Sequence, residues 1–171
     1  MRGIMAIIKI VDRDYSAENS NYDDVDIVML RYISQSEKAV QGLFLGFNVL
    51  ISYPEFMAEQ FKTVRCIFHK QDGRLLRHFI ISYSKNENVD ANQAFVMAYD
   101  IACYYINEYQ IAFAVHQDTE HIHAHFIMNT VSFVDGHKFS EGYEDFNKFM
   151  SYAKSKMPNL NFELASAKDL L

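Results

Sequence analysis

Three things are scarce in this chain of 171 residues: cysteine, long apolar runs and net positive charge. The two cysteines, Cys66 and Cys103, lie in apolar segments far from any second cysteine. This argues against a disulfide or a zinc–thiolate pair and predicts two buried free thiols. No apolar run approaches the ~20 residues that a membrane-spanning helix needs, so we expect no membrane insertion. The net charge of −6 by itself argues against a polyanionic partner.

The positive charge that is present is unevenly distributed. Between residues 62 and 85 there are six basic residues and one acidic residue, Asp72. The basic residues are Lys62, Arg65, Lys70, Arg74, Arg77 and Lys85. Such a stretch is typical both of a solvated basic surface and of a nucleic-acid contact, and the charge pattern does not choose between them.

The chain has no repeats and no low-complexity linkers, and its length is that of one domain, residues 1–171. Periodicity and turn residues predict strands near residues 6–11, 76–84, 111–116 and 121–133, and helices near 24–39, 55–68, 90–108 and 144–157. The apolar segment 42–52 stays open in type. This order predicts an α+β fold, in which a central, mainly antiparallel sheet carries helices packed on one face.

The most informative segment runs from His116 to Asn129 and holds four of the seven histidines. Within it His121, His123 and His125 alternate with apolar residues. Alternation at period two indicates a β-strand, on which these three side chains share one face. Unpaired imidazoles are costly to bury, so a row of them predicts a bound divalent metal.

A tight hairpin would return His116 alongside His123 and His125, so that three imidazoles converge on one cation and leave positions open for water or phosphate oxygen. His121 lies nearest the turn, which favours a role beside the metal or facing the substrate. A purely structural zinc site usually takes four ligands, often thiolates, and no cysteine is near. The histidines alone permit zinc, manganese, nickel or iron.

Three further side chains are candidates for supporting this site. Asp118 and Glu120, in the connection, are placed to accept a ring N–H and fix a histidine tautomer. Asn129 has the same parity as the histidines and lies further along the strand.

The pattern His-x-Asp-x-x-His-x-His-x-His followed by Asn129 resembles the third motif of plasmid mobilisation relaxases of the MobA/VirD2 type. These are HUH endonucleases, named for a His-hydrophobic-His element that residues 123–125 would fill. The segments 30–39, 77–84 and 132–139 are similar to the family's first motif, central strand and exit hairpin. The resemblance covers about residues 6–157 and implies the HUH relaxase fold with a ferredoxin-like core.

The resemblance implies that Tyr32 is the nucleophile and that His116, His123 and His125 are the metal ligands. From their position in the hairpin, Asp118 and His121 are further catalytic candidates. Such enzymes nick one strand of DNA at an origin of transfer, become joined to the 5′ phosphate through tyrosine and leave a free 3′ hydroxyl. The implied ion is magnesium or manganese in the cell, and zinc, nickel or manganese in a purified sample.

The implied partners are single-stranded and supercoiled DNA at an origin of transfer, accessory mobilisation proteins and the coupling protein of a type IV secretion system. The implied location is the bacterial cytoplasm, with transfer to the recipient cell alongside the DNA. Full-length relaxases carry a further C-terminal region, so we expect this chain to correspond to the nuclease domain. Arg74, Arg77 and Lys85 are the candidate phosphate contacts.

Three other interpretations stay open at this point. A replication-initiator HUH nuclease would place its tyrosine on a later helix, where Tyr152 lies, although Ser155 occupies the place of that group's lysine. The acidic balance favours a DNA-binding module with a degenerate active site. A zinc hydrolase that does not act on DNA would have metal-dependent esterase activity that does not require Tyr32.

Overall fold

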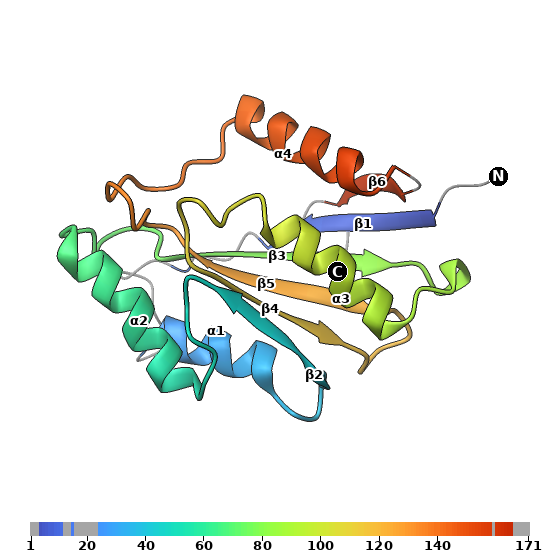
Figure 1. Cartoon of the computed structure of the whole chain (residues 1–171), viewed down its shortest axis with the longest axis horizontal. Helices are drawn as coiled ribbons and strands as arrows, with labels where there is room; N and C mark the ends of the chain where they lie inside the picture. Colours follow the sequence, from blue (N-terminus) through green and yellow to red (C-terminus); the bar gives the residue numbers. More distant parts are fainter. Residues whose placement is uncertain (1–3, 12–14, 16–23, 159, 166–171) are drawn as a thin grey trace.

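The described residues form one mixed sheet and four α-helices (Figure 1). A computed structural model describes residues 4–11, 15, 24–158 and 160–165. The strands are β1 (Ile4–Ile10), β2 (Ala39–Phe47), β3 (Leu76–Tyr83), β4 (Ile111–His116), β5 (His123–Asn129) and β6 (Leu160–Ala165). The helices are α1 (Val25–Ser34), α2 (Pro54–Ile67), α3 (Ala91–Ala102) and α4 (Tyr143–Lys156), with a 3-10 turn at Lys85–Glu87.

The sheet has the order β2-β4-β5-β3-β1-β6, and every neighbouring pair is antiparallel except β1 and β6. The predicted α+β class and mainly antiparallel sheet are therefore confirmed. Strand β6 was not predicted from the sequence, and most of β2 falls in the apolar segment whose type stayed open. The helix expected to reach residue 108 ends at Ala102, after beginning at the capping box that Asp90 forms with Gln93.

The helices cover both faces of the sheet, so the prediction that they pack on one face is wrong. Helices α1 and α2 pack on the face that carries Ala112 and Ile127, whereas α3 and α4 pack on the face that carries Phe113 and Phe126. All residues of β4 are buried. An uninterrupted apolar strand such as 111–115 is typical of a sheet covered on both sides, and this was the signal in the sequence.

Neither cysteine is fully buried. Cys66 is exposed and Cys103 is half-buried, and both are free thiols. The prediction of buried thiols is therefore wrong, because the apolar segments around them belong to amphipathic helix ends that turn these positions outward. Among the described helices, none combines the length and the apolar character that crossing a bilayer requires.

A buried polar network ties α1 and α2 to the sheet. The guanidinium of Arg65 on α2 donates to the carboxylate of Asp26 on α1 and to the side-chain oxygen of Asn129 on β5. Asn129 in turn donates to the carbonyl oxygen of Phe61. Arg65, Asp26 and Asn129 are at most 2% exposed. The network therefore fixes where α1, and with it Tyr32, lies over the sheet.

Replacing Arg65 with leucine should lower the free energy of unfolding by about 3–5 kcal/mol, because Asp26 would be left buried without its partner. Denaturant titration followed by circular dichroism measures the loss. The double variant Asp26→Leu/Arg65→Leu should recover part of it.

The control is Arg31→Leu, which removes the ion pair with Glu55 at the surface. Both side chains of that pair are about half exposed, so the expected loss is below about 1 kcal/mol. Equal losses in Arg65→Leu and Arg31→Leu would contradict the structural role of the buried network.

Candidate metal centre and active site

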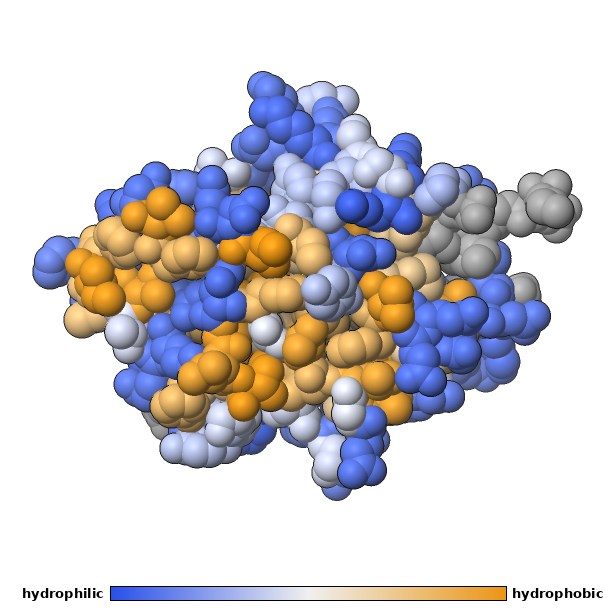
Figure 2. Space-filling model, viewed as in Figure 1, coloured by the Kyte–Doolittle hydropathy of each residue, from blue (hydrophilic) through white to orange (hydrophobic). Residues whose placement is uncertain are grey.

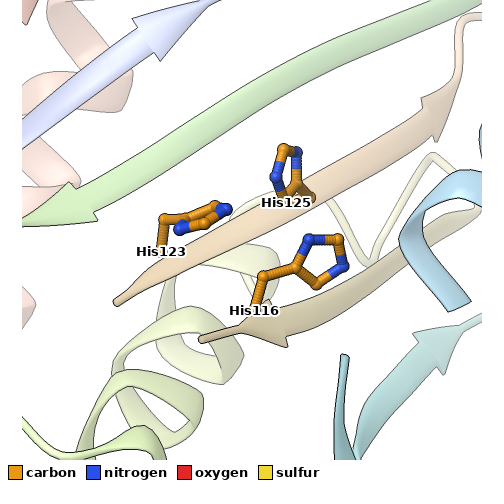
Figure 3. A group of neighbouring side chains, drawn as sticks. All are labelled: His116, His123 and His125. Carbon is orange, nitrogen blue, oxygen red and sulfur yellow. The ribbon is translucent and has the colours of Figure 1, made fainter. Parts of the chain in front are cut away.

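Three histidines from two adjacent strands point toward one another above the sheet (Figure 3). His116 ends β4 and pairs in register with His123 at the start of β5, and His125 follows two residues later on the same face. One ring nitrogen from each of the three lies within 4.8 Å of the others. Metal–nitrogen bonds are about 2.1 Å long, so small side-chain movements suffice for all three to reach one ion.

Two of these histidines are oriented by main-chain carbonyl groups. The Nε2–H of His116 donates to the carbonyl oxygen of Ile33 on α1 over 2.9 Å. The Nδ1–H of His123 donates to the carbonyl oxygen of His121 over 2.8 Å. A carbonyl only accepts, so each contact places the proton on one nitrogen and leaves the other with a free lone pair.

The third histidine is oriented by another side chain. The Nδ1 atom of His125 lies 2.9 Å from Nε2 of His78 on β3. The Nδ1 atom of His78 lies 3.0 Å from the hydroxyl oxygen of Tyr15. His78 falls within the segment 77–84 that resembles the family's central strand, and the sequence pattern predicted no role for it.

The remaining nitrogens are well suited to a metal ion. Nδ1 of His116 and Nε2 of His125 are buried without a hydrogen-bond partner among the described residues, which is costly unless another group fills the space between them. Burial lowers the pKa of both histidines below its usual value, so both offer neutral lone pairs. The carboxylate of Asp118 lies 3.6 Å from Nε2 of His123 and adds negative charge. Nitrogen donors suit manganese, iron, nickel or zinc better than magnesium.

Tyr32 packs directly on the histidines. It lies in the last turns of α1, and its ring centre is 5.3 Å from that of His125 and 5.9 Å from that of His116, in edge-on contacts. The ammonium group of Lys38 lies 4.5 Å from the centre of the Tyr32 ring. A half-buried tyrosine, a lysine and three imidazoles therefore share one surface.

Tyr152, the rival tyrosine, lies in the other helix layer. Its hydroxyl donates to the carbonyl oxygen of Asp100 on α3, and its ring packs on Tyr104. Helices α3 and α4 cover the face of the sheet opposite the histidines. Tyr152 is thus separated from His116 and His125 by the sheet itself.

A cavity of about 370 Å³ opens beside Tyr32 and is lined also by His78, His125 and Lys9. Lys9 on β1 pairs with Ile80, which pairs with His125, so the lysine and the histidine lie in one row across the sheet, on the same face. Lys9 was not predicted as a site residue, because it stands alone in an apolar strand and only strand pairing brings it to the site.

The residues predicted around the hairpin differ in their placement. Asp118 lies beside His123, as described above. The side chain of His121 is exposed, and it is the main-chain carbonyl of this residue that reaches the site. Glu120 is exposed and forms an ion pair with Lys85. The expectation that Glu120 orients a ligand is therefore corrected: Ile33, His121 and His78 provide those contacts.

Of the predicted phosphate contacts, Arg77 is wrongly assigned. It is 1% exposed and donates to Tyr105 and Glu141 on the face opposite the histidines, because alternate residues of β3 point to opposite faces. Arg74 is exposed and precedes the first residue of β3, Leu76, which pairs with Asn129. Asn129 is four residues along β5 from His125, so Arg74 lies toward the end of the sheet away from the triad.

Lys85 is exposed beside the hairpin at the histidine end of the sheet. The parity of Asn129 suggested that it supports the metal ligands, and this expectation is wrong. Its side chain belongs to the buried network with Arg65, at the far end of β5.

Comparison with known proteins places this sequence in a family. The sequence pattern of the family described as Relaxase: MobA/VirD2-like, nuclease domain matches residues 32–156. The chain belongs to this family. The matched region begins at Tyr32 and contains all three clustered histidines.

Relatives of this relaxase domain come from Staphylococcus aureus. A protein named "Protein rlx" is 30% identical over 99 residues, which are 58% of this chain and 30% of that protein. Another of the same name is 28% identical over 109 residues, 64% of this chain and 33% of the relative. The chain thus spans about a third of the length of the curated relatives that it matches. No solved structure matches the chain.

Proposed function

We propose that this relaxase domain nicks one strand of DNA at an origin of transfer and becomes joined to the new 5′ phosphate through Tyr32. The observation that carries the proposal is the packing of Tyr32 on His116 and His125. The family to which the chain belongs implies DNA nicking in mobilisation. The role of Tyr32 as nucleophile, its adduct with the 5′ phosphate and the origin of transfer as target are part of the proposal.

The proposed chemistry assigns one role to the metal ion and one to Tyr32. A divalent ion, manganese or magnesium in the cell, held by the three histidines would neutralise charge on the scissile phosphate and make phosphorus easier to attack. The phenolic oxygen of Tyr32 would lose its proton and bond to phosphorus while the bond to the 3′ oxygen breaks. The 3′ oxygen would take up one proton and leave as a 3′ hydroxyl, so the proton lost by the phenol balances the one gained. The ester bond conserves the energy of the broken linkage, so the reverse reaction can rejoin the strand.

Positive charge close to the site would hold the strand. Lys9 borders the cavity beside Tyr32, and Lys38 lies over its ring. Both ammonium groups can neutralise phosphates flanking the scissile one. Ser82 pairs with His123 in register and shares its face, which places a hydroxyl donor in the same row.

The surface of α3, on the opposite side of the sheet, is poorly suited to DNA. Helix α3 contains no basic residue, and Val96 and Tyr99 are exposed on it. Figure 2, in the same view as Figure 1, shows apolar side chains across the centre of the face that α3 crosses. Phosphate contacts need cationic side chains. Lys9 and Lys38 lie beside Tyr32, so we propose that the DNA binds on the face of α1 and the histidines.

The wider role proposed follows from the family. Accessory mobilisation proteins would bring the domain to supercoiled origin DNA, and a type IV secretion coupling protein would pass the protein–DNA adduct from the cytoplasm to the recipient cell. The acidic net charge of −6 favours such help, because unaided phosphate binding is weak on an acidic protein.

A capture experiment tests the proposal without knowledge of the nick site. The protein is incubated with Mn²⁺ and a pool of randomised single-stranded DNA carrying a 3′ label, and adducts that survive detergent denaturation are isolated and sequenced. The expected result is a labelled protein band whose attached DNA molecules share a sequence at their 5′ ends. The band should disappear completely when EDTA removes the ion. Metal binding with no adduct would refute the nuclease proposal and favour a DNA-binding module.

A further inference from the structure

The two-histidine contact between His78 and His125 differs from the other contacts that orient the triad. His78 is 5% exposed, and its ring lies against that of His125 with centres 5.2 Å apart and planes inclined by 28°. The facing nitrogens are 2.9 Å apart. Both rings lie on the sheet face that α1 covers, and Tyr32 packs on each of them.

A single proton occupies the space between two nitrogens at this distance. If the proton is on Nδ1 of His125, the lone pair of Nε2 of that residue is free and faces the other two ligands. If the proton is on Nε2 of His78, Nδ1 of His125 accepts it, and Nε2 of His125 then carries a hydrogen that blocks a metal bond. The tautomer of His78 therefore decides whether His125 can be a ligand.

The contact with Tyr15 is compatible with the first arrangement. Nδ1 of His78 lies 3.0 Å from the Tyr15 hydroxyl, whose oxygen can accept a hydrogen bond. A proton held there leaves Nε2 of His78 as an acceptor. The Ile33 and His121 carbonyls orient the other two histidines and cannot change their hydrogen-bonding character, so only His125 depends on a side chain with two tautomers.

We propose that His78 is a positioning residue of the metal centre: it accepts the Nδ1–H of His125 and so keeps Nε2 of His125 available to the ion. The proposal deepens the proposed function, on which it rests only for the identity of the metal site. It concerns metal affinity and not the nucleophile. It can therefore fail while the nuclease proposal stands, and the nuclease proposal can fail while this one stands.

Titration calorimetry of the whole chain with Mn²⁺ tests it. His78→Leu removes the acceptor and should weaken Mn²⁺ binding by about 10–100-fold, the range typical of residues that orient a ligand. His78→Gln offers an amide oxygen to the same N–H and should recover most of the affinity. Unchanged affinity in His78→Leu, or equal weakening in both variants, would overturn the proposal.

A matched control is available elsewhere in the chain. His137 also forms a histidine–tyrosine contact, with Nε2 2.5 Å from the Tyr109 hydroxyl, but it lies outside the triad. His137→Leu should bind Mn²⁺ as the unchanged protein does. A loss equal to that of His78→Leu would mean that the effect is a general one on folding and would overturn the assignment.

The unsubstituted protein provides a second measurement that does not depend on the variants folding. Long-range ¹H–¹⁵N spectra of the Zn²⁺-bound protein distinguish the two tautomers of each histidine. We expect His78 to carry its proton on Nδ1 and to present Nε2 as acceptor. A proton on Nε2 of His78 would refute the proposed arrangement.

Discussion

Tyr32→Phe should abolish the covalent DNA adduct completely while leaving Mn²⁺ affinity unchanged. Phenylalanine keeps the ring that packs on His116 and His125 and removes only the oxygen that would bond to phosphorus. No other described tyrosine has its ring in contact with these two histidines. The adduct is measured as label that stays with the protein after denaturation in detergent, and the metal by calorimetry.

Tyr152→Phe is the matched control, because it makes the same chemical change on the other side of the sheet. Its hydroxyl contacts a main-chain carbonyl of α3, so this variant should form the adduct at a rate close to that of the unchanged protein. An adduct that survives in Tyr32→Phe and disappears in Tyr152→Phe would overturn the assignment and favour a replication initiator.

The second large effect is expected from the metal ligands. His125→Ala should lower Mn²⁺ affinity by more than the ~10–100-fold that loss of an orienting residue costs, and adduct formation should fall below detection at micromolar Mn²⁺. The reason is the burial of His125. The ring is 3% exposed, its Nε2 has no hydrogen-bond partner among the described residues, and we assign no other described side chain to take its place as a ligand.

The matched control for the metal centre is His121→Ala. His121 belongs to the same histidine row in sequence, but its ring is exposed and only its main-chain carbonyl contacts His123. Because the substitution keeps that carbonyl, Mn²⁺ affinity should stay within about threefold of the unchanged value. Equal losses in His121→Ala and His125→Ala would mean that the ion takes a different set of ligands.

Several features of the site follow from local rules alone. Residues 121–125 alternate histidine with apolar side chains, and the next strand back along the chain ends at His116. Strand parity and a short hairpin are then enough to bring His116, His123 and His125 together, as the structure has them. Parity applied to β3 would also have separated buried Arg77 from His78, which lies on the site face.

Other features depend on which elements become neighbours, and local rules do not contain them. The prediction of a single helix layer was wrong, because the apolar run 111–115 belongs to a strand that helices cover on both faces. Asn129 shares the parity of the ligands, yet its amide bonds to α2, since the helix covers that end of β5. The buried Arg65–Asp26 pair joins segments 39 residues apart and has no local signature.

The sequence alone therefore determined which three histidines lie together, because alternation on one strand and a tight connection to its neighbour act over a few residues. Tertiary structure decided what surrounds them. Tyr32, His78 and Lys9 come from α1, β3 and β1, and they reach the triad only through the order of strands in the sheet and the packing of a helix on it. Those arrangements are set by burial across the whole domain, which no short stretch of the chain encodes.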